Sequence, residues 1–96
     1  EKYPAVYILT NSYKSVFYTG VTTNLLQRIY QHKMHLADGF SKKYGLKLLV
    51  YFEMHEDIEA AIQREKRLKR WRRDWKIKLI EKQNPHWQDL YPLIQG

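Results

Sequence analysis

The first 19 residues contain two segments typical of β-strands, set close together. Residues 5–10 (AVYILT) and 16–19 (VFYT) are rich in β-branched and aromatic side chains, which favour extended, half-buried backbone. Residues 11–14 (NSYK) between them are typical of a turn. Parallel strands need a much longer crossover, so this spacing predicts an antiparallel hairpin and argues against a doubly wound parallel fold. With such a turn, we expect Tyr7 opposite Tyr18 on one face of the sheet.

A helix is expected directly after the hairpin. Gly20 supplies backbone freedom where the second strand ends. Asn24 can cap a helix that runs to about residue 36, and Gln27 can reach back to that cap. The lysine-rich residues 41–45 (SKKYG) then predict a basic loop. A helix and a loop therefore separate the hairpin from the next strand.

The second half of the chain predicts one more strand and then helices. Residues 47–54 alternate in hydrophobicity as a strand does, and Asp57 or Glu56 can cap the helix that follows. The sequence WRRD favours a break, with Asp74 capping a third helix, although one continuous helix is the alternative. Asn84 fits the start of a short final turn, because proline follows it.

The expected order of elements is β-β-α-β-α-α, in a single domain that spans residues 1–96. This order gives an α+β fold, a small and largely antiparallel three-stranded sheet flanked by helices. The hydrophobic fraction of 44% indicates a folded unit. The sequence contains no run of about 18 apolar residues, so no membrane span is expected. The absence of cysteine excludes disulfides, thiolate catalysis and thiolate zinc sites, and it fits a cytoplasmic protein.

The positive charge of the chain is concentrated in one segment. The formal net charge is +7, and residues 64–82 carry ten Lys or Arg against three acidic residues. A localised basic surface is typical of proteins that bind a polyanion, although a solvated helix face is the simpler alternative. We expect nucleic-acid contacts from one helix face that bears Lys66, Arg67, Lys69, Arg70, Arg72 and Arg73.

Glu65 is the most informative anomaly of the second expected helix. Helical spacing places it on the apolar stripe formed by Ile58, Ala61, Ile62 and Leu68. An ionised carboxylate on a core-facing stripe is costly unless it is paired or binds a metal. The alternatives are a salt bridge to a buried arginine, or a position at the edge of the stripe that reaches water.

Five polar residues form a candidate site: Tyr7, Tyr18, Arg28, His32 and Glu65. Arg28 and His32 lie four residues apart and so share a helix face. Arginine suits phosphate binding and developing negative charge. Tyrosine is a poor base because its pKa is about 10, and nearby cations are expected to lower that pKa. One glutamate can hold magnesium when water and a phosphate oxygen complete the shell. Together these residues fit a one-metal phosphodiesterase, although each alone also fits packing or a solvated helix.

In sequence order, these residues resemble the GIY-YIG nuclease family, which is named for its two tyrosine-bearing strands. The matching positions are Ala5-Val6-Tyr7, Tyr18-Thr19-Gly20, Arg28, His32, Glu65 and Asn84. Ala5 stands for the glycine of the first motif and Thr19 for the isoleucine of the second, and neither position carries the chemistry. Asn84 would contact the substrate, and it fits equally well as a helix cap. The stretches REKRLKRW and NPHWQDL resemble small stand-alone bacterial members, which are similar to the N-terminal nuclease domain of the excision-repair endonuclease.

The resemblance implies a DNA endonuclease that uses Mg²⁺ or Mn²⁺ and no small-molecule cofactor. Tyr7, near His32, would be the base, and Tyr18 would hydrogen-bond the water or the phosphate. Arg28 would stabilise charge on the reacting phosphate, and Glu65 would hold the metal. Structure-selective cutting in DNA repair or recombination is the expected activity.

Two other classes of function remain open. A nucleic-acid-binding module without turnover would explain the basic segment equally well, and it would bind DNA in a salt-sensitive way. An interaction protein would use Trp71, Trp75 and Trp87 as a partner surface, and it would have negligible affinity for DNA.

Overall fold

A computed structural model describes residues 3–34 and 39–95. Its centre is a three-stranded antiparallel sheet of order β2-β1-β3, with β1 at Ala5–Thr10, β2 at Phe17–Thr22 and β3 at Leu48–Met54. All six residues of the central strand β1 are buried. The hairpin, the third strand and the α+β class are therefore as predicted from the sequence.

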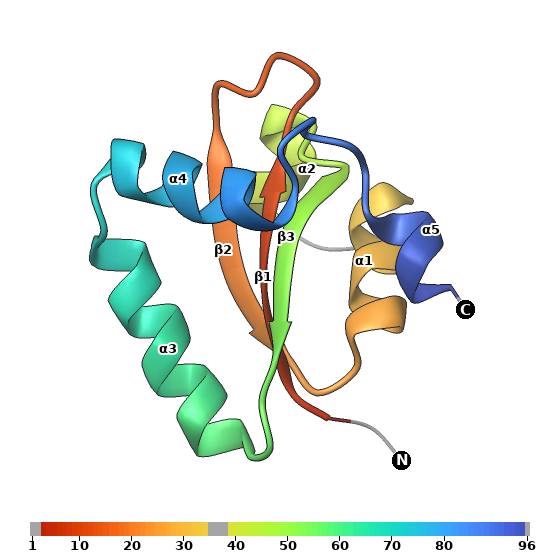
Figure 1. Ribbon diagram of the computed structural model, residues 1–96. Coiled ribbons are helices and arrows are strands. Elements are labelled where there is room, and N and C mark those ends of the chain that lie inside the picture. Colours follow the sequence, from red (N-terminus) through yellow and green to blue (C-terminus); the bar gives the residue numbers. More distant parts are fainter. Residues whose placement is uncertain (1–2, 35–38, 96) are drawn as a thin grey trace.

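Helices cover both faces of this sheet (Figure 1). Helices α3 (Ile58–Arg70) and α4 (Arg73–Gln83) lie on one face, and α1 (Leu25–Lys33) and the short α5 (Tyr91–Ile94) lie on the other. Successive side chains of β1 therefore enter different cores. Tyr7 packs with residues of α1, whereas Val6 and Ile8 pack with residues of α3 and α4.

Side-chain caps begin two of the helices, as expected. Asn24 accepts a hydrogen bond from the backbone N–H of Gln27 (3.2 Å), and Asp57 accepts one from Ala60 (2.8 Å). The expected cap of α4 was wrong. Arg72 takes the N-cap position, and Asp74 lies in the first turn, where its carboxylate pairs with Arg72 at 3.0 Å. Only residues up to 34 of the first helical segment are described, so the expected end near residue 36 lies outside the described residues.

The register of the hairpin differs from the prediction. Tyr7 pairs with Gly20, and Tyr18 pairs with Leu9. The connection is longer than a four-residue turn because hydrogen bonds from Lys14 and Ser15 to Asn11 close a wider loop. The two-residue shift keeps both tyrosines on one face, because side chains alternate along a strand. It also places Gly20 inside β2 rather than at its end.

The expected basic loop at residues 41–45 is also wrong, because a short helix, α2, occupies Gly39–Tyr44. Gly45 ends this helix with a φ of +65°, a conformation that favours glycine. The backbone N–H of Leu46 then donates to the carbonyl of Ser41 at 2.9 Å. The lysines suggested a loop, but Gly45 caps a short helix here, and Ser41 within that helix is buried.

Within residues 3–34 and 39–95, every helix is too short or too polar to cross a membrane.

Candidate active site

The phenol of Tyr7 lies directly over Gly20 of the edge strand β2. A Cβ atom at Gly20 would lie 2.5 Å from both Cζ and Oη of Tyr7, and 3.0 Å from Cε2 of Tyr18. These distances are too short for any side chain. Glycine is needed here for space, and not for the backbone freedom that the sequence suggested, because Gly20 has no positive φ. The two tyrosine rings share this space, with centroids 6.3 Å apart.

A buried chain of hydrogen bonds connects Tyr7, His32 and Ser41. The hydroxyl of Tyr7 lies 3.1 Å from Nε2 of His32, and Nδ1 of His32 lies 2.8 Å from Oγ of Ser41. All three residues are at most 5% exposed. When the phenol donates to Nε2, the Nδ1–H of the imidazole donates to Ser41. The imidazole is therefore placed to take the phenol proton. Sequence reasoning missed Ser41, because nothing distinguishes a serine in a lysine-rich segment.

Burial decides the protonation of Tyr7. It raises the pKa of Tyr7 to about 12, while Arg28 opposes the rise and the charges of Tyr18 and Glu65 add to it. Arg28 lowers the pKa of Tyr7, as expected of a neighbouring cation, but desolvation outweighs this effect and the net shift is upward. Contact with Tyr7 in turn raises the pKa of Arg28. The guanidinium also donates to Oε1 of Gln31 at 3.1 Å, which fixes it on α1.

Glu65 is 8% exposed, although it carries a carboxylate. Its Oε2 lies 2.7 Å from Nζ of Lys69, one helical turn further on. The partner is therefore a half-exposed lysine and not the buried arginine considered from the sequence. The charge of Glu65 raises the pKa of Tyr7, and the charge of Tyr18 contributes to the raised pKa of Lys69. The Glu65–Lys69 ion pair is therefore within electrostatic reach of both tyrosines, although α3 covers the opposite face of the sheet.

A single carboxylate can hold a metal ion only with help. Among the described residues, no group of three or more acidic or histidine side chains is arranged to bind one. Mg²⁺ commonly uses one or two carboxylates and completes its shell with water and substrate phosphate. Glu65 fits that pattern, because it is a buried carboxylate whose charge reaches Tyr7 of the candidate site.

The basic residues expected to contact DNA are all exposed, but they do not share one helix face, because they come from α3, from the start of α4 and from its N-cap residue, Arg72. Lys69 pairs with Glu65, and Arg72 pairs with Asp74. Arg73 lies 4.4 Å from the ring centroid of Phe17. The remaining three lie on α3: Lys66, Arg67 and Arg70. The positive charge of this segment is as counted from the sequence, but the bend at Trp71 divides the basic residues between two helical directions.

Asn84 is 4% exposed and ends α4. Its amide nitrogen donates to the carbonyl oxygens of Val50 (3.1 Å) and Gln88 (2.8 Å), and its Oδ1 accepts from the N–H of Gln88 (3.0 Å). These contacts connect α4 to β3 and shape the following turn. They give Asn84 a structural role, and its contact with a substrate stays a prediction.

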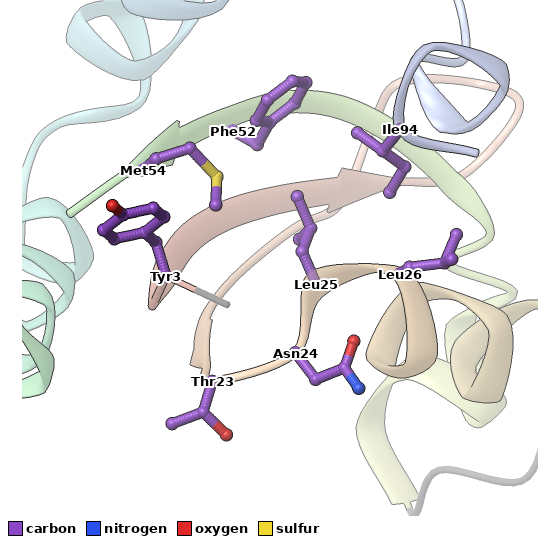
Figure 2. Close-up of a pocket in the computed structure, with 8 residues that line it drawn as sticks. All are labelled: Tyr3, Thr23, Asn24, Leu25, Leu26, Phe52, Met54 and Ile94. Atoms are coloured by element: carbon purple, nitrogen blue, oxygen red, sulfur yellow. The ribbon is translucent and has the colours of Figure 1, made fainter. Parts of the chain in front are cut away.

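The apolar hollow drawn in Figure 2 lies apart from these residues. It has a volume of about 310 Å³ and lies where the start of α1 faces β3 and α5. Its lining is mainly apolar and consists of Tyr3, Thr23, Asn24, Leu25, Leu26, Phe52, Met54 and Ile94. This lining offers no cation to a phosphate, so the hollow does not extend the candidate site.

Comparison with known proteins gives one consistent result. The sequence model of the GIY-YIG catalytic domain matches residues 3–78. A UPF0213 protein of Syntrophus aciditrophicus is 38% identical over 88 residues, which cover 83% of this chain and 91% of the relative. One from Clostridium perfringens is 39% identical over 75 residues, covering 78% and 80%. The solution NMR structure of the UPF0213 protein BH0048 from Bacillus halodurans matches with a TM-score of 0.57 and 27% identity over 90% of each chain.

Proposed function

The chain belongs to the GIY-YIG family, and from this premise we propose that it is an endonuclease that hydrolyses DNA phosphodiester bonds with the help of a divalent metal ion. One observation carries the proposal. A buried tyrosine bonded to a histidine, Tyr7 and His32, lies beside Arg28 and within electrostatic reach of the buried Glu65. A base, a phosphate-binding cation and a metal-binding carboxylate are the groups that phosphodiester hydrolysis requires.

Tyr7 and His32 act together as the general base in this proposal. With a pKa of about 12, Tyr7 is protonated near neutral pH, and its O–H donates to Nε2 of His32. His32 accepts this proton while the Tyr7 oxygen takes one from the attacking water. The water oxygen bonds to phosphorus, and the bond from phosphorus to the 3′ oxygen breaks. The departing alkoxide takes a proton from solvent.

Arg28 and Tyr18 hold the phosphate during this step. Arg28 is half-buried beside the Tyr7 phenol, so its guanidinium carries positive charge where water is partly excluded. Charge that develops on the phosphate is stabilised more strongly there than in bulk water. Tyr18 is half-buried against His32, with ring centroids 5.7 Å apart, and its hydroxyl can bond the water or the phosphate.

Glu65 would hold Mg²⁺ or Mn²⁺ in the working enzyme. A bound divalent ion would neutralise charge on the phosphate oxygens and on the departing group. Lys69 pairs with the same carboxylate in the structure. The lysine would therefore compete with the metal ion for Glu65.

A binding module without turnover is the second candidate, and the exposed basic residues of α3 and α4 favour it. Burial and the like charges of Arg73 and Lys69 lower the pKa of Lys76, so positive charge is concentrated enough there to affect a neighbouring lysine. A polyanion would relieve this repulsion. Under either candidate, DNA lies across these helices, and structure-selective cutting in repair or recombination is the proposed role.

Cleavage of a panel of labelled DNAs distinguishes the two candidates. Flap, nicked, single-stranded and plain duplex DNA would be incubated with Mg²⁺, Mn²⁺ or chelator. We expect metal-dependent cutting by the wild type and by the Glu59→Ala control, whose substituted residue is exposed on the same helix. The Glu65→Ala and Arg28→Ala variants should not cut. Equal cutting by all four proteins would show that the proposed site is wrong, and salt-sensitive binding without cutting would establish the binding module.

A further inference from the structure

Helix α2 presents two aromatic side chains next to the candidate site. Phe40 and Tyr44 are 46% and 41% exposed, and their ring centroids lie 4.8 Å apart. The Phe40 ring also lies 6.0 Å from the ring of Tyr18. A continuous row of three rings therefore leads from the candidate site to the surface.

Cations border this row of rings. Nζ of Lys43 lies 5.4 Å from the centroid of the Tyr44 ring, and Lys42 beside it is exposed. Helix α2 contains no acidic residue. At the other end of the row, Tyr18 contributes to the raised pKa values of both Arg28 and Lys69. Exposed aromatic faces with lysine and arginine alongside are typical of surfaces that bind unpaired nucleic-acid strands, because bases stack on the rings while cations contact phosphates.

The position of α2 relative to the reactive residues is fixed. Ser41 lies between Phe40 and Lys42, and its hydroxyl is 2.8 Å from Nδ1 of His32. Its carbonyl accepts from the N–H of the buried Leu46. A ligand stacked on Phe40 would therefore lie at a defined place beside Tyr18 and the phosphate that Arg28 holds.

We propose that Phe40 and Tyr44 stack on an unpaired nucleotide adjacent to the phosphate that is cut, so that the protein prefers DNA in which a single strand adjoins a duplex. This inference rests on the proposed function, and it adds the substrate class. Bases inside a duplex are already stacked and cannot reach the rings, so only an unpaired base gains from them. A docked protein segment would use the rings equally well, but it would not require the cations at both ends of the row.

Binding in the presence of chelator tests this inference apart from cleavage. The probe is a flap DNA with 2-aminopurine in the single strand beside the junction, and blunt duplex DNA is the comparison. We expect the wild type to bind the flap more tightly and to quench the fluorescence of the 2-aminopurine. The Phe40→Leu/Tyr44→Leu double variant should bind the flap about tenfold more weakly and lose the quenching. Its affinity for the duplex should change less than about twofold.

Matched variants make the result decisive. Tyr30→Leu removes an aromatic ring of similar exposure (49%) from α1 and should leave flap binding and quenching unchanged. Phe40→Trp should retain both, because it keeps a stacking surface, and thermal unfolding would show that each variant is folded. Equal loss on flap and duplex, no loss, or the same loss in Tyr30→Leu would overturn the inference. Stacking that persists in a protein that cuts no DNA would overturn the proposed function but support this inference.

Discussion

Two clusters in this protein contain the same four side-chain types, and their arrangements differ. The site cluster consists of Tyr7, Arg28, His32 and Glu65, and the β3 cluster consists of Tyr51, Glu53, His55 and Arg64. In the β3 cluster one carboxylate is bonded to all three partners: Glu53 accepts from Tyr51 (2.5 Å) and Arg64 (3.0 Å), and it lies 2.6 Å from Nε2 of His55.

The site cluster is connected differently, because no single carboxylate among the described residues joins its members. Tyr7 bonds to an imidazole, and Glu65 pairs with a half-exposed lysine. In the part of the chain that the structure describes, Arg28 has no carboxylate partner. Burial raises the pKa of Tyr7 and of Tyr51 to about 12 in both clusters. The two clusters therefore share their residue types and a raised tyrosine pKa, and they differ in their ion pairs: Glu53 pairs with the arginine of its own cluster, whereas Glu65 pairs with Lys69. We expect the cluster whose arginine is left for a phosphate to be the reactive one.

The largest expected effect is a reciprocal one between the two glutamates. Glu65→Gln should reduce single-turnover cleavage by about 1000-fold, because the metal-binding charge is lost. Glu53→Gln should leave cleavage within about threefold of the wild type at temperatures where the protein is folded. Rates that fall equally in both variants would remove the distinction between the clusters.

Stability should show the opposite pattern. Glu53→Gln breaks a carboxylate network that connects β3 to α3 and should lower the free energy of unfolding by about 2 kcal/mol. Glu65→Gln should cost less, because its partner Lys69 is half-exposed and can be solvated. Urea denaturation of both variants beside the wild type measures this. A larger loss for Glu65→Gln would identify Glu65 as the structural glutamate.

Removing the lysine that competes with the metal should strengthen metal binding. Lys69→Gln leaves Glu65 without its cation, so we expect Mn²⁺ to bind about fivefold more tightly in the absence of DNA. Mn²⁺ titration followed by electron paramagnetic resonance measures the affinity, with Lys66→Gln as a control from the exposed side of the same helix. Unchanged affinity in Lys69→Gln would show that the ion does not bind at Glu65.

The smallest effect concerns acid stability. Burial opposes ionisation of Glu53, but its bonds to Tyr51, Arg64 and His55 outweigh that effect and lower its pKa below the ordinary value. Its contribution is therefore complete above the unfolded-state pKa, near 4.5, and is lost as the pH falls through the lower folded-state value. Melting temperatures measured between about pH 3 and 6 should fall more steeply for the wild type than for Glu53→Gln. Parallel curves would show that Glu53 is not strongly paired in solution.

Sequence patterns predicted what depends on local spacing. The hairpin, the caps at Asn24 and Asp57, and the placement of Glu65 on a buried stripe all follow from periodicity and side-chain chemistry, and the structure bears them out. The predicted register was wrong because it depends on the shape of the connecting loop, and the hydrogen bonds that shape this loop cannot be deduced from residue types. The prediction of a loop at residues 41–45 was wrong because lysine also favours helices, so lysine content does not distinguish the two.

Long-range contacts explain the other errors. Gly20 on β2 pairs with Tyr7 on the adjacent strand β1. That glycine leaves room for the Tyr7 ring is evident only when this pairing is known. The net rise in the pKa of Tyr7 was not foreseen, because burial in the core outweighs the lowering effect of Arg28. The β3 cluster was missed because Arg64 lies 11 residues from Glu53, on another element.

The most direct test compares the two tyrosines in one assay. Single-turnover cleavage of a flap DNA would be measured with the wild type, Tyr7→Phe and Tyr51→Phe under identical metal and pH conditions. Each substitution removes one buried hydroxyl. Tyr7→Phe is expected to cut at least about 100-fold more slowly, and Tyr51→Phe should retain a rate close to that of the wild type. Equal rates for Tyr7→Phe and the wild type would contradict the assignment of the reactive site to Tyr7 and His32.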